Sequence, residues 1–177
     1  MGLSLLTSLG LVSGILSSWI LRSVHFGNFS FWPGLLFGIA IALFFIWQKK
    51  SQSWLKILGF IIASIISYFA AFQLADFLSW SWYSEYSSWL CYLCGGLIGA
   101  LLLSIGFSWL LHRFVWKQIL VLTFVGGLLG VFGYLVSNYL CPDCYRWDFG
   151  GGGGTGFNWL YIIWQTGMAL GFGLMLS

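Results

Sequence analysis

Residues 89–111, WLCYLCGGLIGALLLSIGFSWLL, decide the fold of this chain. The stretch contains no charged residue, and His112 and Arg113 follow it directly. It exceeds the roughly 20 apolar residues that a helix needs to cross the hydrocarbon core of a bilayer. Its apolar residues do not alternate with polar ones, as the strands of a membrane barrel would require. The stretch therefore predicts a transmembrane helix.

Charged and polar residues divide the rest of the chain into further runs of the same kind. Helices satisfy every backbone hydrogen bond within their own segment, so a helical bundle suits a bilayer. We predict an all-α polytopic membrane protein, a compact bundle of six transmembrane helices that forms a single integral membrane domain over residues 1–177. The helices are expected at residues 2–21, 31–47, 54–78, 89–111, 118–139 and 159–176, with a glycine-rich outer loop at 140–158.

The overall composition supports a membrane location and excludes other classes of protein. Of 177 residues, 60% are hydrophobic and only 6% are charged, whereas a soluble domain carries about 25% charged residues. The net charge of +3 is too small to indicate a nucleic-acid partner. The lipid bilayer is thus the expected environment, and a bacterial-type inner membrane or plasma membrane is the expected location.

The distribution of basic residues predicts the orientation, because cytoplasmic connections are enriched in Lys and Arg. With a cytoplasmic N-terminus, the connections after the second and fourth helices lie inside, and both ends of the chain are cytoplasmic. The inside then holds five basic residues against two outside. The inner five are Lys49, Lys50, Lys56, Arg113 and Lys117, and the outer two are Arg22 and Arg146.

Each expected helix carries two small residues spaced four apart, a pattern that lets helix backbones approach closely in lipid. The main interpretation is tight packing within one bundle. The alternative is self-association through the first helix, where Gly10 and Gly14 could receive a neighbouring copy in a homo-oligomer or a larger membrane complex. The predicted packing positions are Gly10, Gly14, Gly34, Gly38, Gly126 and Gly130.

Ionisable residues inside membrane spans are candidates for function, and the chain has few of them. Asp76, with Gln73 one turn earlier, lies near the outer end of the third expected helix. The pair forms a possible polar site for a cation or a proton. Its position within reach of headgroup water favours a local capping role instead.

The four cysteines form the most distinctive pattern in the chain. Cys91 and Cys94 open the fourth helix, and Cys141 and Cys144 follow the fifth. Both pairs fall on the predicted outer side. Structural disulfides, a zinc site and a redox relay are all compatible with this spacing. An oxidising exterior favours disulfides among the four cysteines, with no metal.

The cysteine layout resembles that of the bacterial quinone-linked disulfide-generating oxidoreductases. In that family a Cys-x-x-Cys pair begins an inward-going helix, and a second pair lies in the next outer loop. The resemblance implies Cys91/Cys94 as the quinone-side pair and Cys141/Cys144 as the shuttle pair, which makes these four the catalytic residues and quinone the cofactor. Gly95 stands where the family carries a basic residue.

No catalytic signature accompanies these features, so the sequence favours a non-enzymatic protein that needs no cofactor. In length and helix number it is similar to the small substrate-binding subunits of vitamin uptake systems. We expect a small transport, pore or scaffold subunit that works with partners. The alternative is a quinone-linked thiol–disulfide oxidoreductase.

Overall fold

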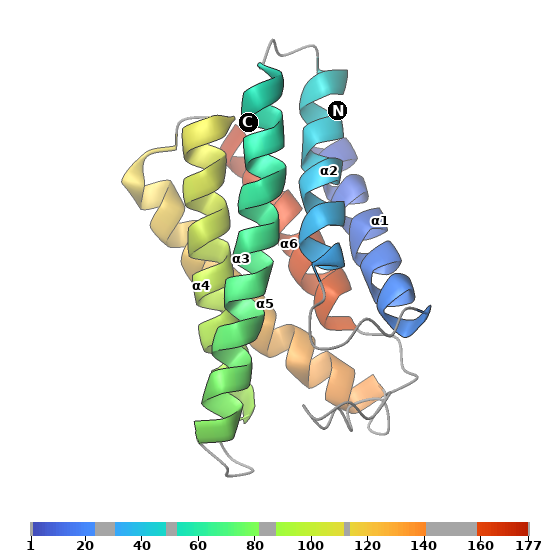
Figure 1. Ribbon diagram of the computed structural model, residues 1–177, viewed down its shortest axis with the longest axis vertical. Coiled ribbons are helices and arrows are strands. Elements are labelled where there is room, and N and C mark those ends of the chain that lie inside the picture. The colour runs from blue at the N-terminus through green and yellow to red at the C-terminus, as the bar shows by residue number, and fades with distance from the viewer. Residues whose placement is uncertain are drawn as a thin grey trace.

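The computed structural model describes residues 2–23, 31–48, 53–81, 88–111, 114–140 and 159–176. Within these ranges every regular element is an α-helix, so the all-α prediction is confirmed (Figure 1). Predicted and observed helix ends differ by at most three residues, at the end of the third helix. The helices are α1 (Gly2–Ser23), α2 (Trp32–Trp47), α3 (Trp54–Ser81), α4 (Ser88–Leu110), α5 (Trp116–Leu140) and α6 (Trp159–Leu176).

Five of these helices, all except α2, are long and apolar enough to cross a membrane. Helix α2 has 16 residues and so measures about 24 Å, less than the roughly 30 Å of a hydrocarbon core. Pro33 lies in its first turn, where the missing N–H costs no helical hydrogen bond. The start of the short α2 therefore lies deeper in the bundle than the last turns of its neighbours α1 and α3, which end on the same side (Figure 1).

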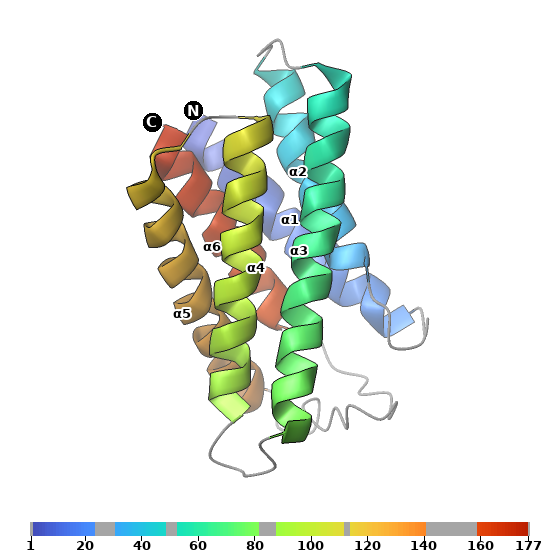
Figure 2. The same ribbon diagram turned by 60° about the vertical axis from the view of Figure 1, so that its left-hand side comes forward.

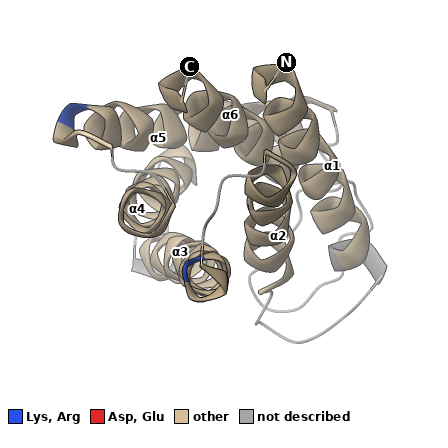
Figure 3. Cartoon of the chain, turned by 90° about the horizontal axis from the view of Figure 1, so that it is seen from above, with Lys and Arg blue, Asp and Glu red and all other residues tan. Residues whose placement is uncertain are grey.

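The helices form a closed ring in chain order. Each helix packs on the one before it and the one after it, and α1 packs on α6 to complete the ring (Figure 2). Successive helices run in opposite directions, so α1 begins and α6 ends at the same end of the bundle (Figure 1). We call this the terminal end. Its described lysines, Lys56 and Lys117, lie in the first turns of α3 and α5 (Figure 3).

The outer surface of the ring is apolar on every helix, as a lipid-facing surface must be. Large exposed hydrophobic side chains occur on all six, for example Leu11, Leu43, Ile66, Trp109, Leu128 and Leu170. Four tryptophans, each more than half exposed, form a belt at the terminal end: Trp47, Trp54, Trp109 and Trp116. Tryptophan concentrates where the hydrocarbon core meets water, so this belt marks a membrane interface.

Candidate functional site

The interior of the ring toward the terminal end is filled by phenylalanine rings. Phe107 of α4 stacks on Phe172 and Phe114, with ring centroids 4.4 and 5.0 Å away. The rings of Phe45 and Phe60 meet it edge-on, each at 5.6 Å. We call these five residues the phenylalanine plug. Because they come from α2, α3, α4, α6 and the segment before α5, the plug joins most of the ring across its centre.

A buried polar cluster lies among α1, α2 and α6, formed by Ser13, Ser17, Gln165 and the carbonyl of Pro33. Gln165 is fully buried, and its amide oxygen accepts a hydrogen bond of 2.5 Å from the Ser13 hydroxyl. Its amide nitrogen donates to the Ser17 hydroxyl at 3.1 Å and to the Pro33 carbonyl at 3.2 Å. One side chain thus connects three helices.

Aromatic residues of α3 and α6 lie beside the polar cluster. The ring of Tyr68 lies 5.1 Å from Trp164 and 6.3 Å from Tyr161. The indole N–H of Trp164 donates to the Gly126 carbonyl at 3.1 Å. The Tyr68 hydroxyl oxygen is buried and interacts with the adjacent Gln165 side chain. Within the part of the chain that the structure describes, no group, Gln165 included, meets full hydrogen-bond geometry with this oxygen. This hydroxyl is therefore a polar group in an apolar interior that can still form a hydrogen bond.

Sequence reasoning missed Gln165, although the signal was present. Gln165 is an amide in the middle of the sixth apolar run, and an amide in a bilayer must find partners. Successive helical residues point about 100° apart. Trp164 and Gln165 consequently face different neighbours, α5 in one case and α1 with α2 in the other.

The predicted packing glycines all lie at contacts between helices of the ring. A β-carbon added at Gly34 would come 2.7 Å from the Ser64 carbonyl oxygen of α3, and one at Gly38 would come 3.0 Å from the Cα of Ile61. Gly126 and Gly130 meet the backbone or β-carbons of α4. Real β-carbons essentially never come closer than 3.0 Å to other atoms, so Gly34, Gly126 and Gly130 require glycine, and Gly38 lies at this limit.

The alternative use of Gly10 and Gly14, as a groove for a second copy, does not fit the structure. A β-carbon at Gly10 would lie 2.8 Å from the Gln165 carbonyl oxygen, and one at Gly14 would lie 2.6 Å from the Cα of Ile162. Helix α6 already fills this groove. The α1 backbone is therefore used within the chain, and the second copy that we considered has no access to these two glycines.

The possible polar site on α3 lies apart from this interior cluster along the helix. Asp76 follows Tyr68 by eight residues, or about 12 Å of helix. Asp76 is half-buried, and Gln73 is exposed. A role for this pair in binding a cation or a proton stays a prediction.

The first cysteine pair lies in the opening turns of α4, with Cys91 buried and Cys94 half-buried. No disulfide joins these two residues. Cys141 and Cys144 lie outside the described residues, as does most of the predicted loop 140–158, so linkage between the pairs stays a prediction. Among the side chains that the structure describes, no group of three or more His, Cys, Asp or Glu could hold a metal ion.

Comparison of the chain with protein-family models, with curated proteins and with solved structures gives no match.

Proposed function

We propose that this chain is a non-enzymatic subunit of a membrane transport system that binds a small uncharged solute in its interior. The proposal rests on one observation. Among the described residues, none meets full hydrogen-bond geometry with the buried Tyr68 hydroxyl, which lies beside the polar cluster in a bundle whose interior is otherwise mostly apolar. Polar groups are costly to bury in a membrane and commonly mark a functional site there. A solute that presents an amide or a hydroxyl would satisfy this group.

Two features support transport over the other roles considered for such a subunit. An open pore needs a water path, whereas the phenylalanine plug fills the interior toward the terminal end. A scaffold needs only a suitable exterior and gives no reason for a buried tyrosine hydroxyl beside a polar cluster that joins three helices. Because the phenylalanine plug fills the interior toward the terminal end, a solute would reach the Tyr68 site from the other end of the bundle. Alternating access requires a site that opens to one side of the membrane at a time.

The charge distribution supports a neutral solute. The charged side chains that the structure describes, Lys56, Asp76 and Lys117, lie toward helix ends rather than around Tyr68. An ion at the centre of a bilayer needs a charged partner or water, because its transfer from water is expensive. The neighbouring rings of Tyr68, Tyr161 and Trp164 suit a flat molecule that stacks on them.

The proposed function includes an orientation of the bundle in the membrane. All six helices, the short α2 included, cross the membrane, and the terminal end faces the cytoplasm of a bacterial-type inner membrane or a plasma membrane. The bias of basic residues supports this orientation. Partner subunits supply the energy for any active transport. Labelling of Lys56 by an impermeant amine reagent from the outside of intact cells would contradict the orientation.

A quinone-linked thiol–disulfide oxidoreductase remains the second proposal, favoured by the placement of Cys91 and Cys94 three residues apart in the first turns of α4. The same structure weighs against it in one respect, since a thiol that attacks a partner disulfide must be accessible and Cys91 is buried. Replacement of all four cysteines by serine distinguishes the two proposals. The transport subunit keeps solute binding after this change, whereas the oxidoreductase loses its activity.

Thermal unfolding of the purified chain in mild detergent tests solute binding. The probes are small neutral ring amides, with nicotinamide against the charged nicotinate as a matched pair. A neutral probe at ten times its Kd should stabilise the wild type by about 1.4 kcal/mol. Tyr68→Phe, which removes only the hydroxyl, should weaken this effect.

Ser67→Ala is the matched control, because the Ser67 hydroxyl donates within its own helix, to the Ala63 carbonyl. It should leave the response to nicotinamide unchanged. If no neutral probe stabilises the wild type more than Tyr68→Phe, the proposed site is wrong.

A further inference from the structure

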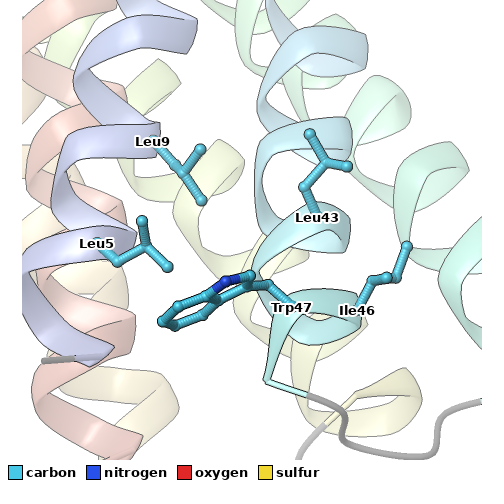
Figure 4. Close-up of a pocket in the computed structure, with 5 residues that line it drawn as sticks. All are labelled: Leu5, Leu9, Leu43, Ile46 and Trp47. Carbon is cyan, nitrogen blue, oxygen red and sulfur yellow. The ribbon is translucent and has the colours of Figure 1, made fainter.

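An apolar groove runs between α1 and α2 on the outside of the ring. It has a volume of about 360 Å³ and is lined by Leu5, Leu9, Leu43, Ile46 and Trp47. Leu5 and Leu9 stand on α1, and the indole of Trp47 reaches from α2 toward them across one end of the groove (Figure 4). The groove lies near the terminal end, where α1 begins and α2 ends.

This groove faces the lipid rather than the bundle interior. Leu43, Ile46 and Trp47 are 52%, 45% and 57% exposed. The interior faces of α2 are instead formed by fully buried residues such as Phe37 and Ile41. In a membrane the exposed side of α2 meets hydrocarbon, so the groove is filled from the bilayer.

The size of the groove decides which occupant fits. A cavity of about 150 Å³ lined by aliphatic side chains accepts benzene. A groove of 360 Å³ therefore has room for a flexible hydrocarbon segment larger than benzene. A lipid acyl chain has this shape.

The surroundings of the groove at its Trp47 end indicate the charge of the lipid headgroup. Trp47 belongs to the tryptophan belt, so this end lies at the level of the headgroups. The chain continues from Gln48 directly into Lys49 and Lys50, and the exposed Lys56 lies at the same end of the bundle (Figure 3). Basic residues at a membrane surface attract anionic lipids.

We infer that the groove between α1 and α2 binds one acyl chain of an anionic phospholipid whose headgroup meets the basic end of the bundle. The lipid would fill the space beside the short α2 and hold α1 against it. This inference does not depend on the proposed transport function, because no residue that lines the groove belongs to the Tyr68 site.

Native mass spectrometry of the delipidated full chain tests the inference, with phosphatidylglycerol and phosphatidylcholine of identical acyl chains as probes. The wild type should retain one phosphatidylglycerol at several-fold lower lipid concentration than phosphatidylcholine. Lys49→Ala and Lys50→Ala should each reduce this preference by up to about fivefold. Lys117→Ala, on α5 at the same end, is the control and should leave it unchanged. Equal retention of the two lipids overturns the assignment to an anionic lipid.

Two further measurements locate the acyl chain. Leu43→Trp fills the groove and should abolish retention of the single lipid, whereas Leu128→Trp, at a similarly exposed position on α5, should not. A phosphatidylglycerol with a diazirine in its acyl chain should label wild-type peptides that contain residues 5–9 and 43–47 above all others. Uniform labelling along the outward faces of the six helices overturns the site even if Leu43→Trp fails to fold.

Discussion

Helices α4 and α6 each pack against more than one other helix, but they are held by different means. Helix α4 uses glycine on two sides. A β-carbon at Gly95 would meet the Ala71 carbonyl oxygen of α3 at 3.0 Å, and one at Gly96 would meet the Gly126 carbonyl oxygen of α5 at 2.5 Å. Helix α6 adds polar side chains, because Gln165 bonds to α1 and α2 while Trp164 bonds to α5.

The difference shows two ways to associate helices where the hydrophobic effect does not drive them together. Close backbone approach gains dispersion contacts over a long surface, and it tolerates no added volume. An interhelical hydrogen bond gains about 0.6 kcal/mol in a membrane, and it depends on one pair of atoms. A substitution that adds volume on α4 should thus lower the free energy of unfolding more than one that removes hydrogen bonds of α6.

The largest effect is expected from Gly96→Ala. The new methyl group would overlap the α5 backbone, which cannot move without separating the two helices, so we expect a loss of about 3 kcal/mol in the free energy of unfolding. Gly59→Ala is the matched control. Its β-carbon would lie 3.4 Å from a flexible Leu110 methyl group, and its effect should be within about 1 kcal/mol of zero. Unfolding in mild detergent measures both, and equal effects would refute the close-packing interpretation of α4.

A smaller effect is expected from Gln165→Leu. This change keeps similar bulk and removes three interhelical hydrogen bonds, for an expected loss of about 2 kcal/mol. Thr123→Val is the control, since the Thr123 hydroxyl bonds only within α5, to the Ile119 carbonyl at 2.8 Å. The same unfolding measurement applies. A Gln165→Leu variant more stable than the wild type would show that the polar cluster does not hold α6 in place.

The smallest effect is expected from Trp164→Phe. The change removes the single bond from the Trp164 indole to the Gly126 carbonyl, which should cost about 0.6 kcal/mol. The smaller ring also leaves space at this buried position, which should raise the total loss to about 1.5 kcal/mol. Because Gly126 also meets α4, the double variant with Gly96→Ala tests coupling between the two kinds of contact. Strictly additive losses would mean that α4 and α6 are held independently of one another.

The sequence predicted the helices well because their formation in lipid is local. Each backbone group must bond within its own segment, so a long apolar run bounded by charges is sufficient evidence for a helix. The shorter α2 was also visible, as the run 31–47 between Arg22 and Lys49. The importance of Gln165 was not inferred, because its partners Ser13 and Ser17 precede it by 152 and 148 residues.

The sequence by itself determined an apolar, all-helical chain and the positions of its small residues, since both follow from composition and spacing along one segment. The tertiary structure decided which neighbour each small residue meets. Gly10 and Gly14 lie against α6 rather than against a second copy, because the ring closes between the first and last helices. The polar cluster, the phenylalanine plug and the outer groove likewise exist only where helices distant in sequence are brought together, which no local pattern specifies.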